Sequence, residues 1–260
     1  MTNLTASGLH FEETVEPGSS TWVFLVHGSM DRATGFARVR RHLHETSVVA
    51  YDRRGYHRSR TSSRLCDEVG DHVEDLFEIM AGRRGVVVGH SFGAVVALAA
   101  AQAQPEQIPA VVAYEPPMPW APWWPARTPG GAAIEAGAID PYQGAEDFMR
   151  RSIGDRRWER LPEETRRSRR AEGPALVAEM RSIRRGPPPF DPTKVQSFVI
   201  VGRGSSSNDR HRHGAAQLAL ALPRGELHEI PEAGHAAHLS HPVEFAALIA
   251  RAQAQDAMLS

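Results

Sequence analysis

A Gly-x-Ser-x-Gly pattern lies inside residues 86–100, VVVGHSFGAVVALAA, with Ser91 at its centre. A run of valines precedes the pattern and an alanine-rich stretch follows it, so Ser91 is expected on a tight turn between a buried strand and a helix. Gly89 and Gly93 suit that turn, because larger side chains two residues from the serine would collide. The turn exposes the hydroxyl beside the positive end of the helix, which favours nucleophilic attack on a carbonyl carbon. The alternative is a serine that only caps the helix beside coincidental glycines.

A second element of this chemistry is the turn HGSMD, residues 27–31, which directly follows an apolar run. A His-Gly pair at the end of a strand makes a sharp turn, and the next backbone N–H can point back towards the serine. We therefore expect the N–H groups of Ser29 and Phe92 to form an oxyanion hole, which binds the negative oxygen of an acyl-transfer intermediate. Met30, the next residue of the turn, is expected to contact the substrate. An ordinary turn without a catalytic role is the alternative.

Short apolar runs alternate with longer amphipathic stretches along the chain, which predicts an α/β fold. Because the runs are almost continuously apolar, we expect a mostly parallel central sheet covered by helices on both faces. Helices are predicted over residues 36–44, 69–80 and 92–104, and after residue 241. The predicted strands are residues 21–28, 47–52, 85–91, 110–117, 195–204 and 226–235.

Two proline-rich segments interrupt this alternation, PPMPWAPWWP at residues 116–125 and RRGPPPFDPT at residues 184–193. Between them the sequence predicts helices and no buried strand. We therefore interpret residues 117–192 as a helical cap (lid), inserted into a core domain that residues 1–116 and 193–260 form together.

Three tryptophans, Trp120, Trp123 and Trp124, follow the strand that precedes the predicted cap. They are expected either to line the roof of an apolar substrate cleft above the serine or to attach the cap to the core. Arg53 and Arg54, in YDRRGYHRSR, could bind an anionic substrate. We interpret them instead as part of a solvated or ion-paired turn, which is the usual state of arginine.

The motifs HGS, YDRRGYHRS, GHSFGA and PEAGHAAHLSHP occur in the order and spacing of the α/β-hydrolase fold superfamily. The chain resembles that family from about Trp22 to the carboxyl-terminal helix. The resemblance implies a Ser–His–acid triad whose histidine lies in the loop after the last strand. His235 occupies that position, and His238 and His241 are rivals further along the chain. A histidine suits the role of base because its usual pKa is close to neutral pH.

The acid of the triad has two candidates. Many members of the family carry an aspartate shortly after the strand that follows the cap, but this chain has serines there. Asp209 comes several residues later, in a polar and basic stretch that we predict to be a loop. Other members place the acid one strand earlier, where Glu115 lies near the carboxyl end of residues 110–117. We favour Glu115 over Asp209, because a strand end holds a carboxylate more rigidly than a loop does.

The composition is that of an ordinary globular protein, with 260 residues, 41% of them hydrophobic, and a formal net charge of −1. This near-neutral charge argues against a nucleic-acid partner. Cys66 is the sole cysteine, which excludes an internal disulfide and a cysteine-based metal site. We expect a small-molecule substrate, no cofactor, no metal and no membrane association. A cytoplasmic location is expected, because the amino-terminal segment lacks the features of a signal peptide.

Together these features predict a serine hydrolase that cleaves an ester, lactone or thioester of a mostly apolar small molecule through an acyl-enzyme on Ser91. An acyltransferase with the same nucleophile is the first alternative, since a cap that excludes water could pass the acyl group to an alcohol or amine. A ligand-binding protein that keeps the fold without turnover is the second. The intact serine, histidine and oxyanion turn argue against this second alternative.

Overall fold

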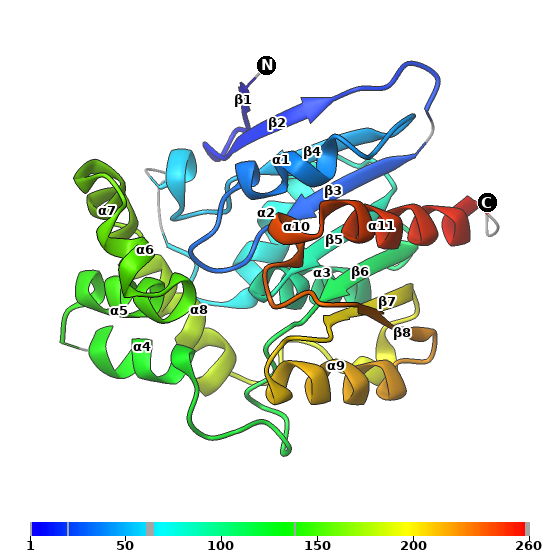
Figure 1. Cartoon of the computed structure of the whole chain (residues 1–260). Helices are drawn as coiled ribbons and strands as arrows, with labels where there is room; N and C mark the ends of the chain where they lie inside the picture. The colour runs from blue at the N-terminus through cyan, green and yellow to red at the C-terminus, as the bar shows by residue number, and fades with distance from the viewer. Residues whose placement is uncertain (1, 20, 61–64, 138, 258–260) are drawn as a thin grey trace.

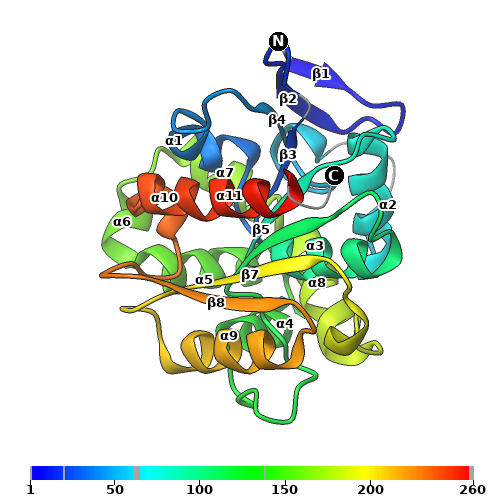
Figure 2. The ribbon, with the colours of Figure 1, turned by 90° about the vertical axis from the view of Figure 1, so that its right-hand side faces the viewer.

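The computed structural model describes residues 2–19, 21–60, 65–137 and 139–257 of the chain. Within them, one sheet of eight strands has the order β1-β2-β4-β3-β5-β6-β7-β8 (Figure 1). Figure 2 shows the same sheet after a quarter turn, with β7 and β8 at one edge and β1 and β2 at the other. The strands are β1 (Thr2–Leu4), β2 (His10–Thr14), β3 (Trp22–Val26), β4 (Ser47–Tyr51), β5 (Val86–His90), β6 (Ala110–Tyr114), β7 (Phe198–Gly204) and β8 (Gly225–Ile230).

Six adjacent strands, β4, β3, β5, β6, β7 and β8, run parallel to one another. Strands β1 and β2 add an antiparallel edge next to β4. In the register of the sheet, Val26 of β3 pairs with Tyr51 of β4 and with Gly89 of β5. Tyr114 of β6 pairs with His90 of β5. The carboxyl ends of β3, β5 and β6 therefore reach the same edge of the sheet, and the predicted site residues follow directly after them.

The strands are almost continuously apolar because their side chains alternate between two buried clusters. On β3, Leu25 lies in the cluster that includes residues of α11 (Pro242–Ala257). Val26, its neighbour, lies in the cluster that includes residues of α2 (Val69–Met80) and α3 (Phe92–Ala103). In Figure 1, α11 lies in front of the sheet, and α2 and α3 lie behind it. The predicted fold class, a mostly parallel sheet covered by helices on both faces, is confirmed.

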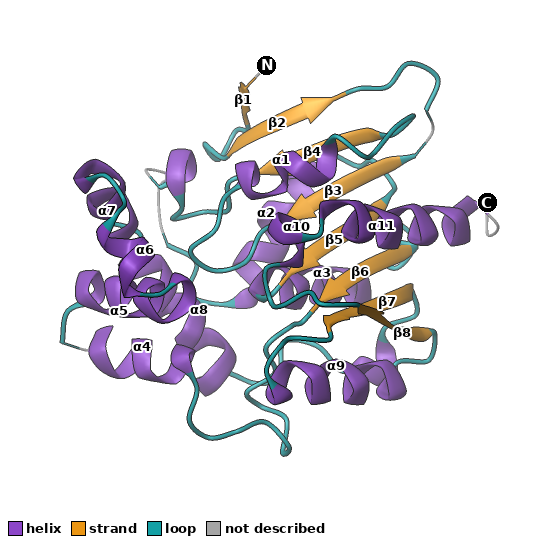
Figure 3. Cartoon of the chain, in the orientation of Figure 1, coloured by secondary structure: helices purple, strands orange, loops and turns teal. Residues whose placement is uncertain are grey.

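Between β6 and β7 the chain forms α-helices that we call the helical insertion. Figure 3 shows them gathered on the side of the sheet to which the arrowheads of β3, β5 and β6 point. The insertion is therefore close to the carboxyl ends of the central strands. Its helices are α4 (Pro129–Gly137), α5 (Pro141–Ile153), α6 (Asp155–Glu159), α7 (Glu163–Arg170) and α8 (Gly173–Arg185).

Several elements differ from the sequence-based expectations. The stretch after β7 was predicted to be a loop, but it forms the helix α9 (Asp209–Ala221), and the side chain of Asn208 caps this helix by accepting a hydrogen bond from the N–H of His211. Instead of one helix over residues 36–44, the chain has a short 3₁₀ helix, η1 (Ala33–Phe36), and α1 (Ala37–Arg40). Strands β1 and β2 were not predicted. None of the helices formed by the described residues is both long and apolar enough to cross a membrane.

Candidate active site

Ser91 occupies the turn between β5 and α3 with a backbone φ of 53° and ψ of −123°. A positive φ is costly for a residue other than glycine, and such strain is typical of functional positions. The two glycines make this turn possible. A Cβ atom added to Gly89 would lie 2.4 Å from the Cα of Ala94, and one added to Gly93 would lie 2.2 Å from the carbonyl oxygen of Val26.

His235 and Glu115 meet at the carboxyl edge of the sheet. The Nδ1 atom of His235 lies 2.6 Å from Oε2 of Glu115, whose side chain is fully buried. The other carboxylate oxygen accepts a hydrogen bond of 2.9 Å from the N–H of Gly204, and the N–H of Glu115 donates to the carbonyl oxygen of Gly202 at 3.1 Å. Strand β7 therefore fixes both the backbone and the side chain of Glu115. A histidine that donates from Nδ1 leaves Nε2 free to accept a proton.

Asp209 lies at the first position of α9. Its side chain has an exposed fraction of 92%, and it pairs with Arg212 one turn further along the same helix. A carboxylate at this position is stabilised by the helix dipole and by solvent. The structure thus brings Glu115, and not Asp209, to His235.

Two further imidazoles, which the sequence analysis missed, surround His235. The ring of His211 stacks on that of His235, with centroids 4.2 Å apart and an interplanar angle of 20°. On another side, Nε2 of His90 donates to the carbonyl oxygen of His235 at 2.8 Å. Burial, followed by the charges of neighbouring cationic groups, holds the pKa values of His90 and His211 well below the usual histidine value. Both are therefore neutral at pH 7 and pack against His235 without adding charge.

The turn of residues 27–31 lies directly against Ser91. A Cβ atom added to Gly28 would lie 3.0 Å from the Cβ of Ser91. Phe92 is the first residue of α3, so its N–H has no partner within the helix. Among the described residues, no hydrogen bond to a protein acceptor engages the N–H of Ser29. Met30 is buried with a φ of 59°, and its carbonyl oxygen accepts a hydrogen bond from Arg169 of the helical insertion at 2.9 Å.

His238, a rival of His235 in the sequence analysis, is buried and makes a different contact. Its Nε2 lies 2.9 Å from Oδ2 of Asp31, at the end of the turn of residues 27–31. Burial alone would raise the pKa of Asp31, but the hydrogen bond from His238 and the nearby histidines hold that pKa well below its usual value. His238 thus joins the turn to the segment that follows His235. His241, the other rival, lies directly before α11 and contacts Ser240 at 2.8 Å.

The three tryptophans are partly buried and lie at two places. Trp120 packs edge-on against Phe190, at the other end of the helical insertion, with ring centroids 5.6 Å apart. Trp124 packs edge-on against His211 with centroids 6.0 Å apart, and Trp123 contacts both Trp124 and α9. Since His211 stacks on His235, Trp124 is the tryptophan nearest to the candidate triad through direct ring contacts.

The two arginines of YDRRGYHRSR are both ion-paired. Arg53 is completely buried, pairs with Glu179 of α8, and lies over the ring of Phe92 at 4.9 Å. Arg54 pairs with Asp75 of α2. Both arginines are therefore ion-paired, as one of the two expectations for this turn had it. The other expectation, a solvated turn, does not hold for Arg53, because its side chain is buried. The sequence carries no local sign of the contact with Glu179, which lies 126 positions further along the chain.

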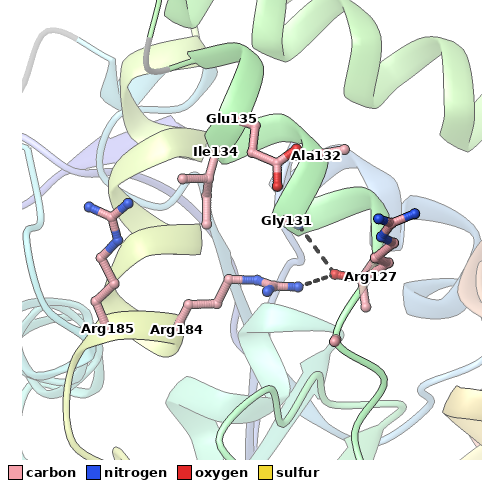
Figure 4. A pocket seen from close by; sticks show the side chains of 9 residues that line it. Arg127, Gly131, Ala132, Ile134, Glu135, Arg184 and Arg185 are labelled. Carbon is pink, nitrogen blue, oxygen red and sulfur yellow. Dashed lines mark hydrogen bonds between the residues drawn. The ribbon is translucent and has the colours of Figure 1, made fainter.

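A cavity of about 570 Å³ opens within the helical insertion, between α4 and α8. Gly131 and Arg184 lie at its wall (Figure 4). The N–H of Gly131 and the guanidinium of Arg184 both donate to the hydroxyl of Thr128. Arg127, Arg185 and Glu135 also line this cavity. None of the predicted site residues belongs to its wall, so we do not place the reaction there.

Three groups of side chains in the described part of the chain have possible metal ligands within 4.8 Å of one another. In each group, the carboxylate already has an internal partner. Asp31 pairs with His238, Asp75 with Arg54, and Glu115 with His235. We assign no metal to these groups.

Comparisons with known proteins agree with this fold. A sequence profile described as "Alpha/beta hydrolase family" matches residues 23–248. Among curated proteins, the "Uncharacterized hydrolase YraK" of Bacillus subtilis (strain 168) is 35% identical over 104 residues, which are 38% of this chain and 38% of that protein. The match thus spans well under half the length of this relative.

Solved structures with the same fold include a thermophilic esterase from Thermogutta terrifontis, with 19% identity, a TM-score of 0.73 and coverage of 96% of both chains. The enol-lactonase from Burkholderia xenovorans LB400 has 17% identity and a TM-score of 0.73, with coverage of 98% of this chain and 100% of that one. At these identities the structural likeness establishes the fold alone.

Proposed function

The chain belongs to the alpha/beta hydrolase family, and from that premise we propose that it is a serine hydrolase that cleaves an ester, lactone or thioester of a mostly apolar small molecule. The observation that carries the proposal is the contact of 2.6 Å between Nδ1 of His235 and the buried carboxylate of Glu115. Ser91 occupies a strained strand-to-helix turn next to this contact: its N–H donates to the carbonyl oxygen of Tyr114, the residue before Glu115, at 2.8 Å. A buried carboxylate that orients an imidazole next to such a serine is the arrangement that activates a hydroxyl for attack.

In the proposed reaction, Oγ of Ser91 attacks the carbonyl carbon while Nε2 of His235 takes its proton. The N–H groups of Ser29 and Phe92 stabilise the negative oxygen of the tetrahedral intermediate. His235 then donates the proton to the leaving alcohol or thiol. Water, deprotonated by the same histidine, attacks the acyl carbon, and the imidazolium returns this proton to Oγ of Ser91 as the acid leaves. Glu115 stabilises the charged imidazolium through both steps.

The surroundings of the site favour an apolar substrate. Met30 is a buried apolar residue of the turn that lies against Ser91, and the ring of Trp124 packs on His211. The imidazoles of His90 and His211, which contact His235 beside the Glu115 carboxylate, are neutral. We include in the proposal that residues 117–192 act as a cap over the substrate, with Trp123 attaching it to the core through α9. Trp120 joins the two ends of the cap through its contact with Phe190. Two structures of the same fold are named an esterase and an enol-lactonase, which agrees with ester or lactone chemistry.

The proposal is tested by covalent labelling. A fluorophosphonate probe should add its mass to the tryptic peptide that contains Ser91, and p-nitrophenyl butyrate should be hydrolysed with a burst of p-nitrophenol. Ser91→Ala should abolish both signals without a change in Tm beyond a few degrees. Wild-type protein that neither takes up the probe nor turns over p-nitrophenyl esters of different chain lengths would refute the assignment of Ser91 as a nucleophile.

A further inference from the structure

A buried carboxylate of the helical insertion contacts the turn that is proposed to hold the oxyanion. Glu179 lies on α8, and its side chain has an exposed fraction of 1%. It accepts hydrogen bonds from the hydroxyl of Ser29 at 2.6 Å and from the hydroxyl of Tyr56 at 2.7 Å, and it pairs with Arg53. The side chain of Ser29 is thus held by a residue of the helical insertion that lies 150 positions away in the sequence.

Arg53 of the core holds the first residue of the same turn, His27. Its Nε donates to the carbonyl oxygen of His27 at 2.8 Å, and its backbone N–H donates to Nε2 of His27 at 2.9 Å. Because Nε2 accepts, Nδ1 carries the proton and donates to the carbonyl oxygen of Gly28 at 2.7 Å. Burial, together with the charge of Arg53, lowers the pKa of His27 to about 3, so this neutral tautomer persists at neutral pH. Residues 27 and 28 therefore have little freedom. The insertion contacts the turn at Ser29, through Glu179, and at the carbonyl oxygen of Met30, through Arg169, and only the contact at Ser29 involves an expected oxyanion donor.

We propose that Glu179 is a positioning residue for the reaction: it holds Ser29 so that the backbone N–H of Ser29 faces the developing oxyanion, and the oxyanion hole is complete only while α8 is seated on the core. The inference rests on the function proposed above. An oxyanion donor works only when it lies at hydrogen-bond distance from the place where charge develops. A hydroxyl tether of 2.6 Å from a buried carboxylate supplies that constraint to the adjacent N–H.

A purely structural role for Glu179 is the competing explanation, because a buried Arg–Glu pair also joins the insertion to the core. The two explanations differ in what the hydroxyl of Ser29 does. If Glu179 only joins two parts of the molecule, then each hydrogen bond to its carboxylate contributes to stability and none affects the chemical step. If Glu179 positions the oxyanion hole, the bond from Ser29 affects kcat, and the bond from Tyr56 does not.

The experiment therefore compares Ser29→Ala with Tyr56→Phe. Each change removes one buried hydroxyl from the same carboxylate, and Ser29→Ala keeps the backbone N–H itself. The kinetics of p-nitrophenyl butyrate hydrolysis, the second-order rate constant of fluorophosphonate labelling and the Tm are measured for both variants. Ser29→Ala should lower kcat and the labelling rate by about tenfold, a fraction of the effect of deleting an oxyanion donor, while KM stays within about threefold. Each of the two changes should lower the Tm by a similar amount, because each removes one buried hydrogen bond. Tyr56→Phe should keep kcat within about twofold of wild type.

Glu179→Gln adds a second test from the other side of the contact. It should lower kcat as much as Ser29→Ala, and the double variant should lose little more, because both changes break one interaction. If Glu179→Gln does not fold, because Arg53 is left without a counter-charge, the comparison of Ser29→Ala with Tyr56→Phe decides alone. Equal kcat values in wild type, Ser29→Ala and Tyr56→Phe would overturn the positioning role.

The failure of this inference differs from a failure of the proposed function. In the first case, wild type labels at Ser91 and Ser29→Ala labels at the same rate. In the second case, wild type itself takes up no probe, which removes the reaction that Glu179 would serve.

Discussion

Two carboxylates follow two neighbouring strands of the sheet, and their surroundings are opposite. Glu115, after β6, is buried and accepts two hydrogen bonds, one from the N–H of Gly204 and one from His235. Asp209, after β7, begins a helix and is 92% exposed, with an ion pair to Arg212. The first carboxylate is fixed by the neighbouring strand and shielded from water, so its charge acts strongly on the imidazole. The second is surrounded by solvent, which screens its charge. The position of a carboxylate in the sheet, rather than its place in the family's usual order, therefore decides which one can contact the histidine.

The largest effect is expected from Glu115→Gln. The amide keeps the shape of the side chain but removes the charge that stabilises the imidazolium, so kcat for an ester such as p-nitrophenyl butyrate should fall by about a thousandfold. Steady-state kinetics at pH 8 measures this effect, and circular dichroism shows whether the fold is kept. Activity within tenfold of wild type would break the comparison, because the strand end of β6 would then not supply the acid.

An intermediate effect is expected for His211, the buried residue of α9 that stacks on His235. Burial lowers its pKa in the folded protein below the unfolded value of about 6.5. Below pH 6.5 the unfolded chain binds a proton that the folded chain does not, so the free energy of unfolding falls as the pH falls, by up to about 1.4 kcal/mol per pH unit. His211→Gln should therefore make the free energy of unfolding depend less steeply on pH below 6.5.

The measurement is urea unfolding at pH 7.5, 6.5 and 5.5. His213→Gln is the matched control, because His213 lies two residues further along α9 and is exposed. The control should keep the wild-type dependence on pH. If His211→Gln and His213→Gln both follow the wild-type curve, the segment after β7 does not support His235 through a buried neutral ring.

The smallest effect is expected from Asp209→Asn. An exposed charge at the start of a helix contributes a few tenths of a kcal/mol to stability and does not reach His235, so kcat should stay within about twofold. The same ester assay that serves Glu115→Gln measures it. A loss of kcat as large as that of Glu115→Gln would reverse the ranking of the two carboxylates.

The sequence predicted those features of the molecule that local patterns encode. Helix α2 spans Val69–Met80 as its apolar periodicity indicates, and the apolar runs give the central parallel strands. Rigidity at a strand end favoured Glu115 over Asp209 as the acid, and Glu115 is the carboxylate that contacts His235 in the structure. Helix α9 was missed because its first residues, DRHRH, are polar and charged and show no apolar stripe. The sequence of this stretch therefore resembles a loop, although Asn208 caps it as a helix in the structure.

The contacts that could not be predicted join residues far apart in the sequence. The hydroxyl of Ser29 reaches Glu179 across 150 positions, and the carbonyl of His235 accepts from His90 across 145 positions. No local spacing encodes such pairs, because the packing of separate elements decides them. The same holds for Arg53, whose burial depends on a helix that the chain forms much later.

The attachment of Glu115 to β7 has a consequence for exchanging parts between related enzymes. Its anchors, the carbonyl of Gly202 and the N–H of Gly204, both belong to the sheet and lie outside residues 117–192. A chimaera that replaces this segment with that of another hydrolase would therefore keep Glu115 and its contact with His235 in place. It would lose Glu179, and with it the partner of Ser29 and the counter-charge of Arg53. If Glu179 positions Ser29 as proposed, a graft of a new specificity requires a glutamate at the equivalent position of the incoming helix.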